Sequence, residues 1–183
     1  TNSGGPAALA SDSLAENGLI LAEISERSRQ SLRKKLNPAA QVENPVDMLG
    51  GADEKEYAHA LNVVLADEGV DLVVAILVPQ SLVNPVRVAG ALIEAAKSSE
   101  KPLVACLMGS ASTQEASRLL RENRIPTVDF PELVGSMLGA LVTFSSRKMA
   151  NVADGESNLD IQADSQDALK HFEKLAGMPV LGE

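Results

Sequence analysis

Aromatic residues, cysteine and histidine are scarce in this chain of 183 residues, and each shortage excludes a class of function. Only 2% of the residues are aromatic, which argues against a surface that stacks RNA bases and against an aromatic platform for carbohydrates. The single cysteine, Cys106, excludes an intrachain disulfide framework and a cysteine-rich zinc site. The two histidines, His59 and His171, stand in no metal-binding or nucleophile pattern. We therefore expect no metal site and no catalytic residue within this chain.

Positive charge and long apolar runs are also lacking. Lys and Arg number 16 against 25 Asp and Glu, so the formal net charge is -9. A nucleic-acid-binding protein needs clustered cations to neutralise phosphates, and we therefore expect no nucleic-acid partner. No apolar run reaches the roughly 18 residues of a membrane span, and no signal peptide opens the sequence. The expectation is a cytoplasmic protein without a membrane partner.

The hydrophobic residues, 45% of the chain, are arranged in an alternating pattern. Residues 71–78 and 102–108 are almost continuously apolar, which is typical of parallel strands covered on both faces. Shorter extended segments are predicted at 19–24, 42–48 and 125–128. Amphipathic helices are predicted between the strands, beginning at Pro6, Ser25, Asp53, Asn84, Ser112 and Asp129. This alternation predicts an α/β fold, a flavodoxin-like parallel sheet with helices on both faces.

In such a sheet the ligand lies at the carboxyl edge of the strands. The loops that must gather there are residues 1–6, 47–53, 79–84, 109–112 and 129–131. The first of them contains two adjacent glycines, Gly4 and Gly5, and leads directly into a predicted helix. Glycines let the backbone approach a ligand closely, and free N–H groups at a helix start attract anions. A tight strand-to-helix turn accounts for the same residues without a ligand, and both interpretations stay open.

Two further loops carry polar residues or glycines after an extended segment. Asn44-Pro45-Val46-Asp47 is followed by Gly50 and Gly51, a pattern that also fits a strand end and a plain loop. Gln80-Ser81-Leu82 follows the most apolar strand. Gln80 and Ser81 are able to bind a carboxylate or a phosphate, and they serve equally well as turn residues. Neither loop matches the P-loop or the GxGxxG pattern of nucleotide-binding proteins.

Taken together, these motifs resemble the ADP-forming acyl-CoA synthetases of the succinyl-CoA synthetase superfamily. The resemblance covers roughly residues 1–146 and rests on Thr1-Asn2-Ser3-Gly4-Gly5-Pro6, Glu16-Asn17-Gly18-Leu19, Asn44-Pro45-Val46-Asp47, Pro79-Gln80, Gly109 and Ile125-Pro126. The matching piece is the ligase-CoA domain, a flavodoxin-like unit. The resemblance implies a first strand that ends just before Thr1 and is absent here.

The resemblance implies a reversible conversion of acyl-CoA, ADP or GDP and phosphate into free acid, CoA and nucleoside triphosphate. The reaction passes through an acyl phosphate and a phosphohistidine, which two helix N-termini from related domains stabilise. The implied phosphate- and substrate-binding residues are Asn2, Ser3, Gly4, Gly5, Gln80, Ser81 and Leu82, and the supporting residues are Asn44, Asp47, Gly50, Gly51 and Gly109. The equivalent of Asn2 contacts the acid in succinyl-CoA synthetase. The loop at residues 80–82 departs from the Gly-Gly pattern of that enzyme.

The family's phosphorylated histidine lies in a Ser-His-Thr-Gly context that neither His59 nor His171 has. We therefore expect three partners in the same or another chain: a histidine-bearing ligase domain, a CoA-binding domain and an ATP-grasp domain. CoA, ADP or ATP and Mg would then be ligands of the complete enzyme, and none would bind this domain alone. The substrate would be a small carboxylic acid.

We predict a ligase-CoA domain at residues 1–149, an acidic linker at 150–164 and a helix at 165–183 that leads towards a downstream domain. The last 34 residues carry seven acidic and two basic residues. A regulatory or scaffolding domain of the same fold, as in fusions to acetyltransferases, is the alternative function. A phospho-receiver domain is excluded, because Pro79 and Asp129 follow strands where such a domain needs an acidic cluster and a lysine.

Overall fold

The computed structural model describes residues 1–153, except for the side chains of Ser110 and of residues 145–153. The chain divides into two units, Thr1–Leu141 and Val142–Glu183, and the first contains the whole sheet. Helix α6 runs from Glu132 to Ala153 and so continues into the predicted linker at 150–164. The rest of that linker and the predicted helix at 165–183 lie outside the described residues.

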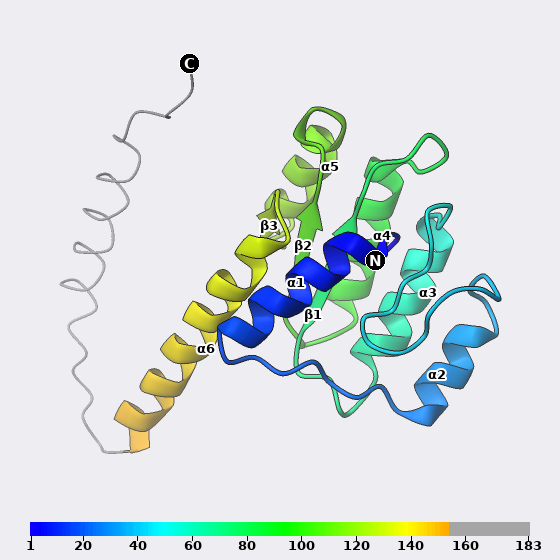
Figure 1. The fold of residues 1–183 in the computed structure, drawn as a ribbon. Helices are drawn as coiled ribbons and strands as arrows, with labels where there is room; N and C mark the ends of the chain where they lie inside the picture. Colours follow the sequence, from blue (N-terminus) through cyan, green and yellow to red (C-terminus); the bar gives the residue numbers. More distant parts are fainter. Residues whose placement is uncertain (154–183) are drawn as a thin grey trace. The chain divides into compact units, whose positions relative to one another are not determined.

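Three parallel strands form the sheet in the order β1-β2-β3 (Figure 1). They are β1 (Val73–Leu77), β2 (Leu103–Leu107) and β3 (Thr127–Val128). The helices that precede α6 are α1 (Gly4–Glu16), α2 (Glu26–Arg33), α3 (Glu54–Leu65), α4 (Pro85–Lys97) and α5 (Ser110–Glu122). The alternation of strands and helices therefore matches the predicted α/β, flavodoxin-like class.

Side chains of successive strand residues point into two separate cores. Val73, Ala75 and Leu77 of β1 belong to a core that contains residues of α2, α3, α4 and α5. Ile76 belongs to a second core, with Ala10 of α1 and Val134 and Leu138 of α6, and also with Val104 and Cys106 of β2. Because both faces are covered, these strands need apolar residues at nearly every position. The prediction of helices on both faces is confirmed.

Capping side chains fix the starts of α3 and α4 at the carboxyl edge of the sheet. The Asp53 side chain accepts hydrogen bonds from the N–H groups of Lys55 and Glu56. The Glu56 carboxylate in turn accepts from the Asp53 N–H, which completes a capping box. Asn84, directly before Pro85, caps α4 by accepting from the N–H groups of Val86 and Arg87. Each such cap stabilises its helix by about 1 kcal/mol, so the loops before α3 and α4 end at defined points.

Two extended segments predicted from the sequence are not strands of this sheet. Residues 19–24 form no strand, and the segment at 42–48 contributes only an isolated antiparallel bridge between Gln41 and Asp47. A strand is defined by pairing, and an apolar sequence alone does not supply a partner. Residues 19–24 lie across an open space from the unpaired edge of β1. They make no backbone hydrogen bond to β1 or to another described strand.

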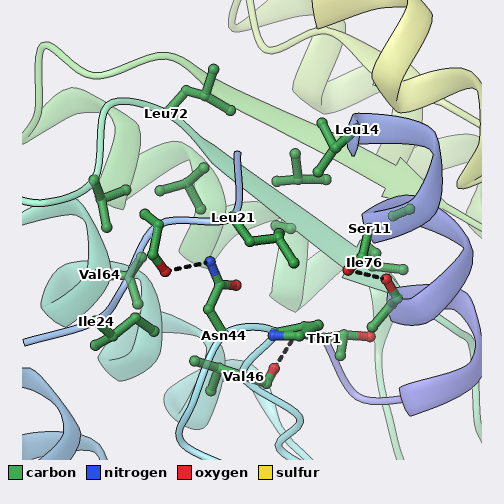
Figure 2. Close-up of a pocket in the computed structure, with 18 of the residues that line it drawn as sticks. Thr1, Ser11, Leu14, Leu21, Ile24, Asn44, Val46, Val64, Leu72 and Ile76 are labelled. Atoms are coloured by element: carbon green, nitrogen blue, oxygen red, sulfur yellow. Dashed lines mark hydrogen bonds between the residues drawn. The ribbon is translucent and has the colours of Figure 1, made fainter. Parts of the chain in front are cut away.

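That space is an apolar groove of about 370 Å³, lined by α1, α3, the 19–24 segment and β1 (Figure 2). The backbone N–H and C=O groups of Val73, Ala75 and Leu77 point towards β2 and pair with it. Those of Val74 and Ile76 therefore point towards the groove. The Tyr57 hydroxyl donates to the Ile76 carbonyl at 2.8 Å. The N–H groups of Val74 and Ile76 have no partner among the described residues.

Thr1 lies at one end of this groove and already pairs as a strand residue does. Its amino group donates to the Val46 carbonyl at 2.9 Å, and its carbonyl accepts from Met48 N–H at 2.8 Å. Burial lowers the pKa of this amino group to about 6, against the opposing effect of the Asp47 charge.

We expect a strand parallel to β1, from residues upstream of Thr1 or from another chain, to fill the groove in the stable protein. The measurement is amide hydrogen exchange on residues 1–183 and on the same chain extended upstream. In the shorter chain Val74 and Ile76 should exchange faster than Ala75 and Leu77, which serve as internal controls because β2 protects them. In the extended chain all four should exchange slowly. Persistent fast exchange at Val74 and Ile76 would show that the groove stays open.

Candidate functional site

The start of α1 presents free backbone donors at the carboxyl edge of the sheet. Ser3 precedes the helix in an extended conformation, with φ -157°, and its side chain makes no capping bond. The N–H groups of Gly4 and Gly5 therefore lack a partner among the described residues, and Pro6 has no N–H to contribute. Both glycines are exposed. An anion bound at this helix start is able to accept from both N–H groups and to interact with the helix dipole.

Thr1 holds the turn that leads into this helix start. Its hydroxyl oxygen accepts from Ser3 N–H at 3.0 Å, and the hydroxyl donates to the Ser3 carbonyl at 3.0 Å. The Ser3 hydroxyl has no hydrogen-bond partner among the described residues and remains available to a ligand. Sequence reasoning did not identify Thr1 as a contributor, since its role depends on these two local bonds.

Asp47 adds a negative charge beside the helix start. A Cβ atom on Gly4 would lie 3.0 Å from Asp47 Oδ2, while Oδ1 accepts from Leu49 N–H at 3.0 Å. A carboxylate here stabilises the helix dipole but repels a bound anion. The loops at residues 1–6, 44–51 and 79–84 contain no Lys or Arg. An anion at this site would therefore depend on backbone N–H groups and the Ser3 hydroxyl, without a basic side chain from these loops.

Two other predicted loops meet beside this helix start. A Cβ atom on Gly50 would overlap with Gln80 Oε1, so the Gln80 amide occupies the space that this glycine leaves. Gly109 has φ +76°, in the left-handed region, and a Cβ on it would lie 3.5 Å from Pro79 Cγ. The loops at residues 47–53, 79–84 and 109–112 therefore lie beside one another, as expected for loops that gather at one edge of a parallel sheet.

The remaining predicted residues are distributed differently. Ser81 and Leu82 are exposed beyond Gln80, and Leu82 reaches 88% exposure, which leaves it free to meet a partner. Gly51 is exposed and has no neighbour within 4 Å of its Cβ position. Asn44 lies apart from the helix start, because its Nδ2 donates to the Ala22 carbonyl at 3.0 Å across the groove (Figure 2). Asn2 is buried and bonded to Val78.

The described residues offer no nucleophile or metal cluster at this edge. Cys106 is fully buried in β2, where burial raises the pKa of its thiol to about 12. His59 is a residue of α3, and its Nε2 lies 3.0 Å from the Ser31 carbonyl oxygen. Within residues 1–153 no group of three His, Cys, Asp or Glu side chains could hold a metal ion. What the described residues of this edge offer to a ligand is the N–H groups of Gly4 and Gly5 and the Ser3 hydroxyl.

No helix in the described part of the chain combines the length and the apolar character that crossing a membrane requires.

Comparison with known proteins identifies relatives with one activity in common. Over 146 residues the chain is 37% identical to the alpha subunit of an ADP-forming acetate–CoA ligase II from Pyrococcus furiosus. The aligned region covers 78% of this chain and 32% of that subunit. Over 149 residues it is 28% identical to an ADP-forming 4-hydroxybutyrate–CoA ligase from Nitrosopumilus maritimus, covering 79% of this chain and 21% of the relative. The chain thus spans about a third or less of these relatives.

Solved structures agree with the sequence comparison. A dinucleotide-forming acetyl-coenzyme A synthetase 1 from Ca. Korarchaeum cryptofilum has a TM-score of 0.76 at 26% identity, covering 86% of this chain and 34% of that one. A protein from Pyrococcus horikoshii OT3 has a TM-score of 0.74 at 39% identity, covering 77% and 33%. The profile of the Ligase-CoA domain matches residues 1–152. The fold, the glycine loops and these matches confirm the resemblance seen in the sequence, and the chain belongs to the Ligase-CoA domain family.

Proposed function

We propose that this chain is the ligase-CoA domain of an ADP-forming acid–CoA ligase, and that the start of α1 supplies one of two helix N-termini that hold a phosphohistidine from a partner domain. The observation that carries the proposal is that Gly4 and Gly5 are exposed at the carboxyl edge of the sheet and that their N–H groups have no partner within residues 1–153. The names of the relatives, all ADP-forming ligases, support this function over a regulatory or scaffolding one.

In this role the domain stabilises charge and leaves bond formation to other groups. Phosphate displaces CoA from the acyl-CoA, the acyl phosphate transfers its phosphoryl group to histidine and releases the acid, and the phosphohistidine passes that group to ADP. A helix N-terminus contributes roughly 0.3–1 kcal/mol to an exposed anion and up to about 2 kcal/mol to a partly buried one. Docking of the partner domain excludes water and strengthens the same interaction.

Nucleotide, Mg and CoA are assigned to other domains of the complete enzyme. The described residues contain no acidic cluster that fits Mg and no P-loop. The Korarchaeum protein has been solved in complex with phosphate and ADP, two ligands that an ADP-forming ligase uses. The acid would be small, since the relatives are named for acetate and 4-hydroxybutyrate.

The proposal is tested on the full-length gene product incubated with radiolabelled phosphate and a short acyl-CoA, without ADP. We expect an acid-labile, base-stable phosphoprotein, the signature of phosphohistidine, that loses its label when ADP is added. A complete protein that turns over acyl-CoA and never becomes labelled would contradict the phosphohistidine role of this domain.

A further inference from the structure

Asn2 is a polar residue in a buried position, with an exposed fraction of only 1%. Its Nδ2 donates to the Val78 carbonyl at 2.8 Å, and its Oδ1 accepts from Val78 N–H at 2.9 Å. The side-chain amide thus pairs with Val78 in both directions, as the backbone of an adjacent strand would. Burial and this double pairing leave the amide no surface with which to meet a ligand.

Thr1 and Asn2 link the segment before α1 to the loops at residues 44–51 and 78–84. Thr1 bonds to Val46 and Met48 on one side, and Asn2 bonds to Val78 on the other. Helix α1 begins two residues after Asn2, and Gln80 follows two residues after Val78. The positions of the Gly4 and Gly5 N–H groups relative to Gln80 therefore depend on the Asn2 amide, together with the bonds that Thr1 makes to Val46 and Met48.

We infer that Asn2 is a positioning residue, which sets the α1 start against the Gln80 loop and does not touch the acid substrate. The inference rests on the proposed function, because the acid and the phosphoryl group are the ligands that this geometry would serve. It differs from the role implied by the resemblance to succinyl-CoA synthetase, in which the equivalent asparagine contacts the acid. The two roles make different predictions about substrate preference.

A positioning residue affects every acid alike, whereas a contact residue discriminates among acids. In the full-length enzyme, Asn2→Leu should lower kcat/KM for acetate, propionate and 4-hydroxybutyrate by one common factor, about tenfold to a hundredfold. The KM for CoA should stay at the wild-type value. Ser13→Ala is the matched control, since Ser13 is also buried and bonds α1 to Glu132 and Gly135 at the far half of the helix. It should lower stability and leave kcat/KM unchanged.

Asn2→Asp gives a pH-dependent version of the same test. A protonated carboxyl can accept from Val78 N–H and donate to its carbonyl, whereas the ionised form would set an oxygen against that carbonyl. Burial raises the pKa of a carboxyl at this position, so the pairing is present below the raised pKa and is lost as the pH rises through it. Activity relative to wild type should therefore recover on acidification in Asn2→Asp but not in Asn2→Leu.

Amide resonances provide a readout that needs no turnover. In Asn2→Asp the N–H signals of Gly4, Gly5 and Gln80 should shift together as the introduced carboxyl titrates. Signals that stay constant through the titration, or a loss of kcat/KM confined to one acid, would overturn the inference even if the enzyme is active. A wild-type protein inactive on every acid would instead overturn the proposed function, and the resonance shifts would still decide the role of Asn2.

Discussion

Residues 1–183 alone are expected to show no conversion of acyl-CoA, ADP and phosphate into free acid, CoA and ATP. The reason is the missing phosphoryl carrier. His59 lies on α3 beside the Ser31 carbonyl, away from the Gly4 and Gly5 N–H groups at the start of α1. Neither it nor His171 has the Ser-His-Thr-Gly context of the family. In the proposed function the start of α1 only holds a phosphoryl group, which a histidine of another domain must carry.

The measurement is ATP formation in a coupled assay that is sensitive to rates far below those of ordinary enzymes. The control is complementation, in which the remaining domains of the same protein, expressed separately, are added to residues 1–183. Activity should appear only in the mixture. Turnover by residues 1–183 alone would show that a residue of this chain carries the phosphoryl group, and would require a different mechanism.

The fold could be predicted where the signal is local or dominated by burial. Strands β1 and β2 follow from apolar runs that only a doubly covered strand needs, and the start of α3 follows from Asp53 and its capping box. The segments at 19–24 and 42–48 could not be predicted correctly. Their apolar residues suit a strand, but strand identity depends on a partner elsewhere in the chain, and the groove beside β1 leaves residues 19–24 without one.

The candidate site divides in the same way. The helix start at Gly4 and Gly5 could be predicted, since glycines before a helix have a local meaning. The contact of Gly50 with Gln80 and the pairing of Asn2 with Val78 could not, since each joins residues far apart in the chain. A buried asparagine that substitutes for strand backbone has the same sequence signature as one that binds a substrate.

The replacement of Gly5 by valine in the full-length protein is expected to slow phosphorylation of the partner histidine by about a hundredfold or more, since one lost donor at an oxyanion site costs roughly 3–4 kcal/mol. A Cβ atom on Gly5 would have no neighbour within 4 Å, and Gly5 does not have a positive φ. Valine also has a better helix propensity than glycine. The fold should therefore be retained, and the side chain would extend into the open space beside the first turn of α1.

The defect should arise from access to the helix start. In a helix the Cα–Cβ bond tilts towards the N-terminus, so the branched side chain would crowd the Gly4 and Gly5 N–H groups where a phosphoryl group must approach. Gly90→Val is the matched control, because Gly90 is an exposed glycine of α4 with an equally open Cβ position. Rapid-quench measurement of phosphohistidine should give a wild-type rate for Gly90→Val and a slow rate for Gly5→Val. A folded Gly5→Val protein phosphorylated as fast as the control would show that residues 4–6 only turn the chain into α1.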